Sequence, residues 1–186
     1  MKNFRILALA LTTIATFTAC SNDGTTVVNE EEVITTITAT FTPAAGGNAI
    51  TLTSRDLDGD GPVAPGVTVS GAFSSGAAYT GTVTFLNEIV NPVVNTTLEI
   101  QEEAVDHQIF FQQTGLGIFT YADADANGHP IGLKFAYTAA ATPANSLLTL
   151  TLRHLPNKSG VNVPTGDITN AGGGTDAEVS FPVVVE

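Results

Sequence analysis

Hydrophobic and polar residues alternate along most of the chain after Val33, which is the pattern of half-buried β-strands. Ile37, Ala39 and Phe41, for example, alternate with threonines. Clusters of Gly, Pro, Asn and Asp separate these runs and indicate turns. No helical pattern long enough for a parallel crossover follows, so the strands should be antiparallel. The sequence therefore predicts an all-β fold, an antiparallel two-sheet sandwich of about nine or ten strands, immunoglobulin-like in outline. A closed β-barrel is the alternative.

One segment, from Leu98 to Phe111, has a mixed pattern. Leu98 and Ile100 alternate with polar residues as in a strand, and residues 109–111 are typical of a buried strand. Between them, we expect the polar residues 102–107 to form at most a single helical turn at a corner of the sandwich.

The N-terminal residues have the features of a bacterial lipoprotein signal. Lys2 and Arg5 precede an apolar run at 6–15, and Ala19 stands directly before Cys20. The apolar run is too short to span a bilayer, which takes about 20 residues. The sequence therefore predicts cleavage before Cys20 and lipidation of its thiol.

Cleavage at this site divides the chain into three parts. They are a lipoprotein signal peptide at 1–19, a flexible acidic tether at 20–32 and a single β-sandwich domain at 33–186. Lipid chains on Cys20 would anchor the protein, and Ser21 after the cysteine favours the bacterial outer membrane. The predicted location is that membrane, at the cell surface or on the periplasmic face. Because Cys20 is the only cysteine, the predicted domain has no disulfide.

The chain is strongly acidic, with 6 basic and 18 acidic residues and a formal net charge of −12. Such a surface is unsuited to nucleic acid, because affinity for phosphate comes largely from Lys and Arg. Cations or a basic protein are the partners that this charge favours.

Two loops share a pattern of alternating acidic residues, D-x-D-x-D-G at 56–61 and D-x-D-x-N-G at 123–128. Calcium requires six to eight oxygen ligands, which such a turn can begin to supply. Neither loop is an EF-hand, because Val67 and Lys134 occupy the position of the bidentate glutamate. The alternative is that these residues simply form tight turns. The candidate calcium ligands are Asp56, Asp58, Asp60, Asp123, Asp125 and Asn127.

The histidines suggest a different kind of metal site. Glu103 and His107 would share one face of a helical turn, and with His154 they could bind a transition metal. The spacing matches no known metal motif, so a solvated polar corner is the alternative. His129 precedes Pro130 in a predicted turn and is a weaker candidate ligand.

Six segments carry a resemblance to a known group of proteins. In order along the chain, they are RDLDGDG, YTGTVTFLNE, EEAVDHQIFF, YADADANGHPIGLK, LRHLPNKSG and DITNAGGGTDAEVSF. The chain from 20 to 186 resembles a flavobacterial-type family of Bacteroidota surface lipoproteins, which are similar to accessory lipoproteins of TonB-dependent receptors. The family label "type 1 periplasmic binding fold" implies repeated strand–helix units, which conflict with this strand pattern. The resemblance places five residues in recurring motifs: Asp56, Asp58, Asp60, His107 and His154.

Together these features predict a non-enzymatic surface lipoprotein and a monomer. It would be a binding or accessory module that partners an outer-membrane receptor barrel in nutrient or metal uptake. The alternative is a structural or adhesive module stabilised by calcium. An enzyme is not predicted, because the chain contains neither a G-x-S-x-G nucleophile elbow nor an H-E-x-x-H zinc motif.

Overall fold

The computed structural model describes residues 32–59 and 61–186. The signal peptide at 1–19, Cys20 and the tether up to residue 31 lie outside the described residues, as does Asp60. The predictions for these positions therefore stay predictions.

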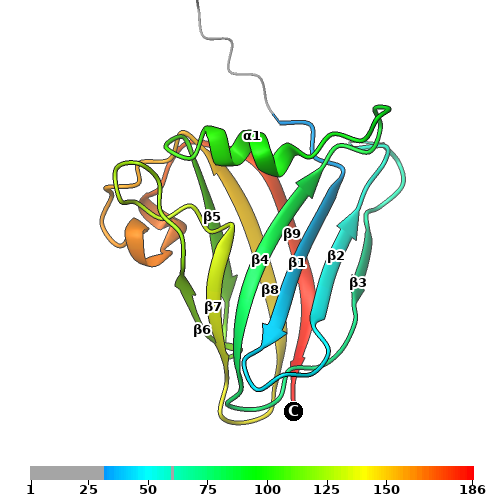
Figure 1. Cartoon of the computed structure of the whole chain (residues 1–186), viewed down its shortest axis with the longest axis vertical. Helices are drawn as coiled ribbons and strands as arrows, with labels where there is room; N and C mark the ends of the chain where they lie inside the picture. Colours follow the sequence, from blue (N-terminus) through cyan, green and yellow to red (C-terminus); the bar gives the residue numbers. More distant parts are fainter. Residues whose placement is uncertain (1–31, 60) are drawn as a thin grey trace, which may run out of the picture. The chain divides into compact units, whose positions relative to one another are not determined.

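The described residues form nine strands in two antiparallel sheets, as Figure 1 shows. In spatial order, the larger sheet contains β3 (Gly66–Val69), β2 (Ile50–Arg55), β1 (Thr36–Pro43), β4 (Ala78–Leu86), β7 (Lys134–Ala139) and β6 (Gly117–Tyr121). The smaller sheet contains β5 (His107–Gln113), β8 (Ala144–His154) and β9 (Gly174–Val185). The predicted all-β antiparallel sandwich is confirmed, and these strands do not close into the alternative barrel.

Alternation along the strands builds the core between the sheets. In β4 every second residue is buried, and in β1 the buried set includes Ile37, Ala39 and Phe41, as the pattern predicts. Phe41 is the centre of an aromatic cluster: its ring lies 4.8 Å from Phe73 and 5.1 Å from Phe135, both edge-on. Such edge-to-face pairs add to the stabilisation from area burial alone.

Helix α1 (Thr96–Glu102) corrects the interpretation of the segment after Leu98. Leu98 and Ile100 are helical and not part of a strand, and the predicted turn at 102–107 begins where the helix ends. The N–H of Thr97 donates to Oδ1 of Asn95 at 3.2 Å, which caps the first turn. Ile100 is fully buried beneath the helix, whereas Leu98 is exposed. The two apolar residues therefore do not share a buried face, as they would in a strand. No helix in the described residues is both long and apolar enough to cross a membrane.

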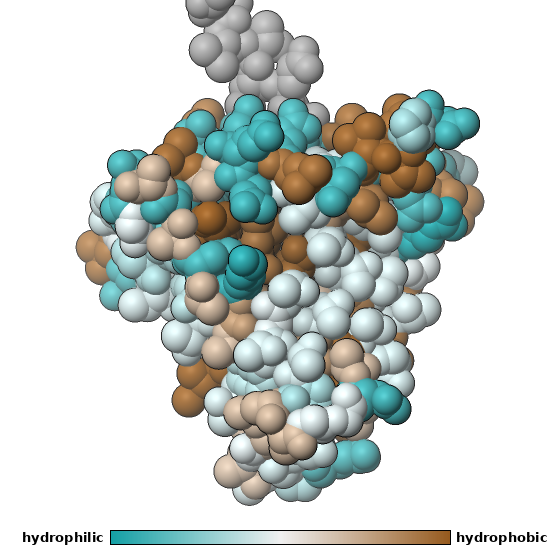
Figure 2. Space-filling model, in the orientation of Figure 1, coloured by the Kyte–Doolittle hydropathy of each residue, from teal (hydrophilic) through white to brown (hydrophobic). Residues whose placement is uncertain are grey.

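Apolar side chains are exposed on the loop between β4 and α1, and Figure 2 shows this part of the surface as hydrophobic. We call this segment the apolar loop and define it as residues 89–94. Its four large apolar side chains are 41–58% exposed: Ile89, Val90, Val93 and Val94. Contiguous exposed apolar surface on a soluble domain often marks a place of contact with a partner.

Gly81 provides a test of the core packing. It pairs with Phe41 on one side and with Phe135 on the other, and a Cβ at this position would overlap the Phe135 ring. We expect Gly81→Ala to lower the free energy of unfolding by about 1–3 kcal/mol, the usual cost of overpacking. Gly71→Ala is the matched control, because a Cβ there meets nothing within 4 Å. Equal urea midpoints for the two variants would contradict this packing.

Candidate metal centre

His107, His154 and Asp176 meet at one end of the smaller sheet. His107 is the first residue of β5 and pairs directly with His154, the last residue of β8. Next to them, β9 begins at Gly174, which pairs with His154. The antiparallel register therefore brings together side chains that lie far apart in the sequence.

A β-bulge turns Asp176 towards the histidines. Leu152 pairs with Ala177 and Arg153 pairs with Thr175, so Asp176 is the extra residue between them. In a regular ladder Asp176 would lie opposite Arg153, on the other face of the sheet from His154, because side chains alternate. The extra residue shifts the register and brings the carboxylate to the face that carries His154.

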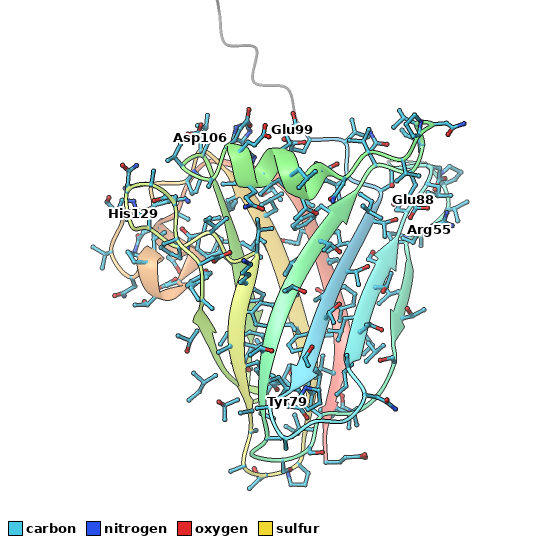
Figure 3. All side chains as sticks on the ribbon, viewed as in Figure 1. Arg55, Tyr79, Glu88, Glu99, Asp106 and His129 are labelled. Atoms are coloured by element: carbon cyan, nitrogen blue, oxygen red, sulfur yellow. The ribbon has the colours of Figure 1, made fainter. Side chains whose placement is uncertain are left out.

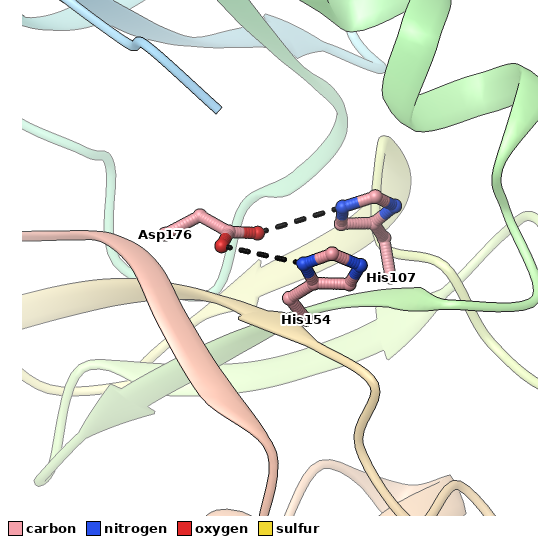
Figure 4. A group of neighbouring side chains, drawn as sticks. All are labelled: His107, His154 and Asp176. Carbon is pink, nitrogen blue, oxygen red and sulfur yellow. Dashed lines mark ion pairs between the residues drawn. The ribbon is translucent and has the colours of Figure 1, made fainter. Parts of the chain in front are cut away.

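The carboxylate of Asp176 lies beside the two imidazole rings and faces one ring nitrogen of each (Figure 4). Its Oδ2 is 3.5 Å from Nε2 of His107, and its Oδ1 is 3.8 Å from Nδ1 of His154. The rings stack with centroids 4.7 Å apart and an angle of 15° between their planes. The side chains of His107, His154 and Asp176 are only 0%, 11% and 2% exposed.

The atoms that face one another in this cluster have no hydrogen-bond partners. Nδ1 of His107 lies 3.1 Å from the carbonyl oxygen of Glu103, so in the neutral ring Nδ1 carries the proton and Nε2 offers a lone pair. Nε2 of His107, Nδ1 of His154 and Oδ2 of Asp176 are all buried and unpartnered. Each buried, unpaired polar atom costs about 1–3 kcal/mol. A proton or a metal ion held among these atoms would satisfy them.

Further carboxylates surround His107. Glu32 and Glu103 each place an oxygen within 4.8 Å of a His107 ring nitrogen, and Glu99 extends from α1 nearby (Figure 3). Burial, together with the charges of Glu99, Asp176 and Glu103, raises the pKa of Glu32 to about 7 against the opposing effect of His107. Repulsion among these acids adds to the demand for a cation.

The same neighbours also change the pKa of His107. Burial lowers the pKa of its imidazole, but Asp176, the Glu103 carbonyl and Glu32 outweigh burial and raise it above its ordinary value. In the absence of a metal ion, these surroundings therefore favour the protonated form of His107.

The loop at 123–128 uses its carboxylates for contacts within the protein. Both oxygens of Asp123 accept backbone N–H groups, from Gly132 and Lys134, each at 2.8 Å. Asp125 accepts the N–H groups of Asn127 and His129 on Oδ1 and the ammonium of Lys158 on Oδ2, at 3.0 Å. All four carboxylate oxygens therefore already accept hydrogen bonds within the protein, and the calcium prediction for this loop stays a prediction.

The Asp125–Lys158 pair is itself buried, with side-chain exposures of 0% and 4%. Burial opposes the charge on Asp125, yet Lys158 and the two backbone N–H groups hold its pKa below its ordinary value. The ammonium group of Lys158 thus supplies a positive charge beside Asp125, where the sequence suggests a calcium ion.

The loop at 56–61 forms turns with its own backbone. Oδ1 of Asp56 accepts the N–H of Gly59 at 3.0 Å, and Oδ2 of Asp58 accepts the N–H of Val63 at 3.1 Å. Because Asp60 lies outside the described residues, the calcium prediction for this loop stays a prediction.

Two of the three predicted transition-metal ligands, His107 and His154, come together, and the third, Glu103, lies beside His107. His129 belongs to neither group of candidate ligands and instead contacts Ser159 through Nε2 at 3.3 Å. Sequence reasoning missed Asp176 and Glu32. The available signal for Asp176 was its place after three glycines, at the start of the last strand, where a bulge is easily formed.

No protein-family model matches this chain, and no curated protein or solved structure is similar to it.

The acid–base properties of the cluster predict how the metal-free domain responds to pH. The pKa of Glu32 rises from 4.5 to about 7 on folding, and that of His107 rises above 6.5. A group with a raised pKa stabilises the fold below its unfolded value, and this contribution is lost as the pH passes the folded value. We therefore expect thermal melting in chelator at a lower temperature at about pH 8 than at about pH 5. Glu32→Gln should reduce this difference and the distant Glu186→Gln should not; equal effects would contradict the assignment.

Proposed function

We propose that this domain binds a divalent transition-metal ion, such as Zn²⁺, through Nε2 of His107, Nδ1 of His154 and the carboxylate of Asp176. The observation that carries the proposal is the convergence of three buried ligand groups whose facing atoms have no hydrogen-bond partner. Two imidazoles and a carboxylate are typical ligands of zinc and related ions, whereas calcium and magnesium favour oxygen alone.

The spacing of the cluster supports a metal ion over a shared proton. Charge-assisted hydrogen bonds between nitrogen and oxygen are about 2.7–2.9 Å long. The separations from Asp176 to His107 and His154 are 3.5 and 3.8 Å. Bonds of about 2.0–2.1 Å to a tetrahedral zinc ion place two ligand atoms roughly 3.4 Å apart. To complete such a site, the three side chains would move inward and one imidazole would turn out of its stacked arrangement with the other.

The contact from His107 to Glu103 also suits a metal ligand. Metal-binding histidines usually donate their second ring N–H to a carbonyl or carboxylate, which fixes the tautomer and the ring orientation. Here the Glu103 carbonyl accepts that hydrogen from Nδ1, which leaves Nε2 directed at Asp176.

We assign binding to this site, and not catalysis, because its three side chains are at most 11% exposed. A bound ion would have little room for a substrate beside it. Three protein ligands nevertheless leave one position of a tetrahedral ion for water or for a ligand from a partner. Such a site suits the storage or delivery of an ion.

The N-terminal signal and the apolar loop extend this proposal to the cell envelope. We place the protein as a lipoprotein of the bacterial outer membrane, anchored at Cys20, and as an accessory of a TonB-dependent receptor in metal uptake. The exposed side chains of the apolar loop supply the kind of surface that a partner protein would cover (Figure 2).

Calorimetric titration of the metal-stripped protein with Zn²⁺ tests the proposed site. We expect one ion per chain and a higher melting temperature, because a ligand at a hundredfold excess over its Kd stabilises the folded state by about 2.7 kcal/mol. His107→Ala, His154→Ala and Asp176→Asn should each abolish tight binding, and Ca²⁺ should not compete.

His129→Ala is the matched control, since this histidine lies outside the cluster. It should bind Zn²⁺ as the unaltered protein does. If the three cluster variants bound Zn²⁺ with unchanged affinity, the proposed centre would be wrong.

Membrane association tests the proposed anchor separately. Cys20→Ser should move the protein from the membrane fraction to the soluble fraction, because it removes the thiol that would carry the lipid and with it the acyl chains that stable anchoring needs. A variant that still sediments with outer membranes after a high-salt wash would exclude lipidation as the anchor.

A further inference from the structure

A hollow in the surface adjoins the proposed metal centre at Asp176. Its lining includes Ile37 of β1, Ser54 of β2, Asp56 after β2, and Asp176 and Glu178 of β9. It lies where residues from the larger sheet face the first residues of the last strand of the smaller sheet. Asp176 therefore belongs both to the metal centre and to the wall of this hollow.

The residue at position 54 explains why space remains here. Ile50, Leu52 and Ser54 form the buried face of β2, so a small polar side chain follows two large apolar ones. Ile37 lies directly opposite Ser54 in β1. Protein cores are otherwise close-packed, and a larger residue at position 54 would fill the gap between the sheets.

The walls of the hollow are acidic. Asp56, Asp176 and Glu178 line it, and none of the described residues in its lining is basic. A concave surface with charges of one sign raises the local concentration of ions of the opposite sign and speeds their association. The side chain of Asp176 is 2% exposed, and its Oδ2 has no hydrogen-bond partner. The hollow thus leads from acidic walls to an unsatisfied, buried carboxylate.

We infer that this hollow is the route by which a divalent metal ion reaches and leaves the His107–His154–Asp176 centre. Asp56 attracts the ion, and Asp176 is the first ligand that it meets. The inference rests on the proposed metal centre and adds the path of exchange, which sets how quickly the protein can give up its ion.

Binding kinetics distinguish a route from a ligand. A residue that lines the route changes the association and dissociation rates together and leaves Kd unchanged, whereas a ligand changes Kd. We would measure both rates by stopped flow on the full chain, with Co²⁺ absorption for association and transfer of Zn²⁺ to a chelating dye for dissociation.

Ser54→Leu should slow both rates several-fold with little change in Kd, because leucine fills the hollow without contacting the ion. Thr53→Leu, whose side chain lies on the opposite face of β2, should change neither rate. Asp56→Asn should slow association at low ionic strength, and this effect should fade as salt screens the charge. Glu186→Gln is the control, because it removes the same charge just after β9, about 33 Å from Asp176 by strand geometry.

Unchanged rates in both Ser54→Leu and Asp56→Asn, in a protein that still binds Zn²⁺ at His107 and His154, would overturn the route alone. If the unaltered chain bound no ion, the metal centre itself would fail, and the route would fail with it. A lower affinity in Ser54→Leu with an unchanged association rate would also overturn the route, because it would indicate a distorted centre.

Discussion

The β-bulge in β9 is the feature on which the proposed function depends. It inserts Asp176 between the residues that pair with Leu152 and Arg153 and thereby changes the face on which the carboxylate lies. The carboxylate then meets His107 and His154, which the ladder between β5 and β8 holds as direct partners. Bulges are frequent next to functional sites because they redirect a side chain through a local break in the ladder. Here a single extra residue converts a structural end of the sheet into a group of three potential ligands.

Buried polar atoms without partners lower the stability of the folded protein. Packing elsewhere in the domain offsets this effect. The core between the sheets is rich in edge-to-face aromatic contacts around Phe41. Elsewhere, a buried carboxylate is neutralised within the protein, since Lys158 reaches Asp125 at 3.0 Å. No Lys or Arg plays that part for Asp176, whose ion-pair partners within the described chain are the two histidines. This difference between the two carboxylates separates a structural ion pair from the proposed metal site.

The alternation of apolar residues in β1 and β4 was sufficient to predict the sandwich, because a period of two is visible in the sequence alone. The same alternation was misleading at Leu98 and Ile100, where the Asn95 cap and the burial of Ile100 favour a helix. His107 and His154 could be named as candidate ligands from their residue type, but their pairing depends on strand register. Asp176 could not be found in this way, because only the bulge determines the face on which it lies.

Diffraction from crystals grown with Zn²⁺, recorded at the zinc absorption edge, tests the central claim most directly. The account predicts one anomalous peak about 2.0–2.2 Å from Nε2 of His107, Nδ1 of His154 and an oxygen of Asp176. The claim would be contradicted if no peak lay there and Nε2 of His107 had instead closed to about 2.7–2.9 Å from the carboxylate, the length of a direct hydrogen bond.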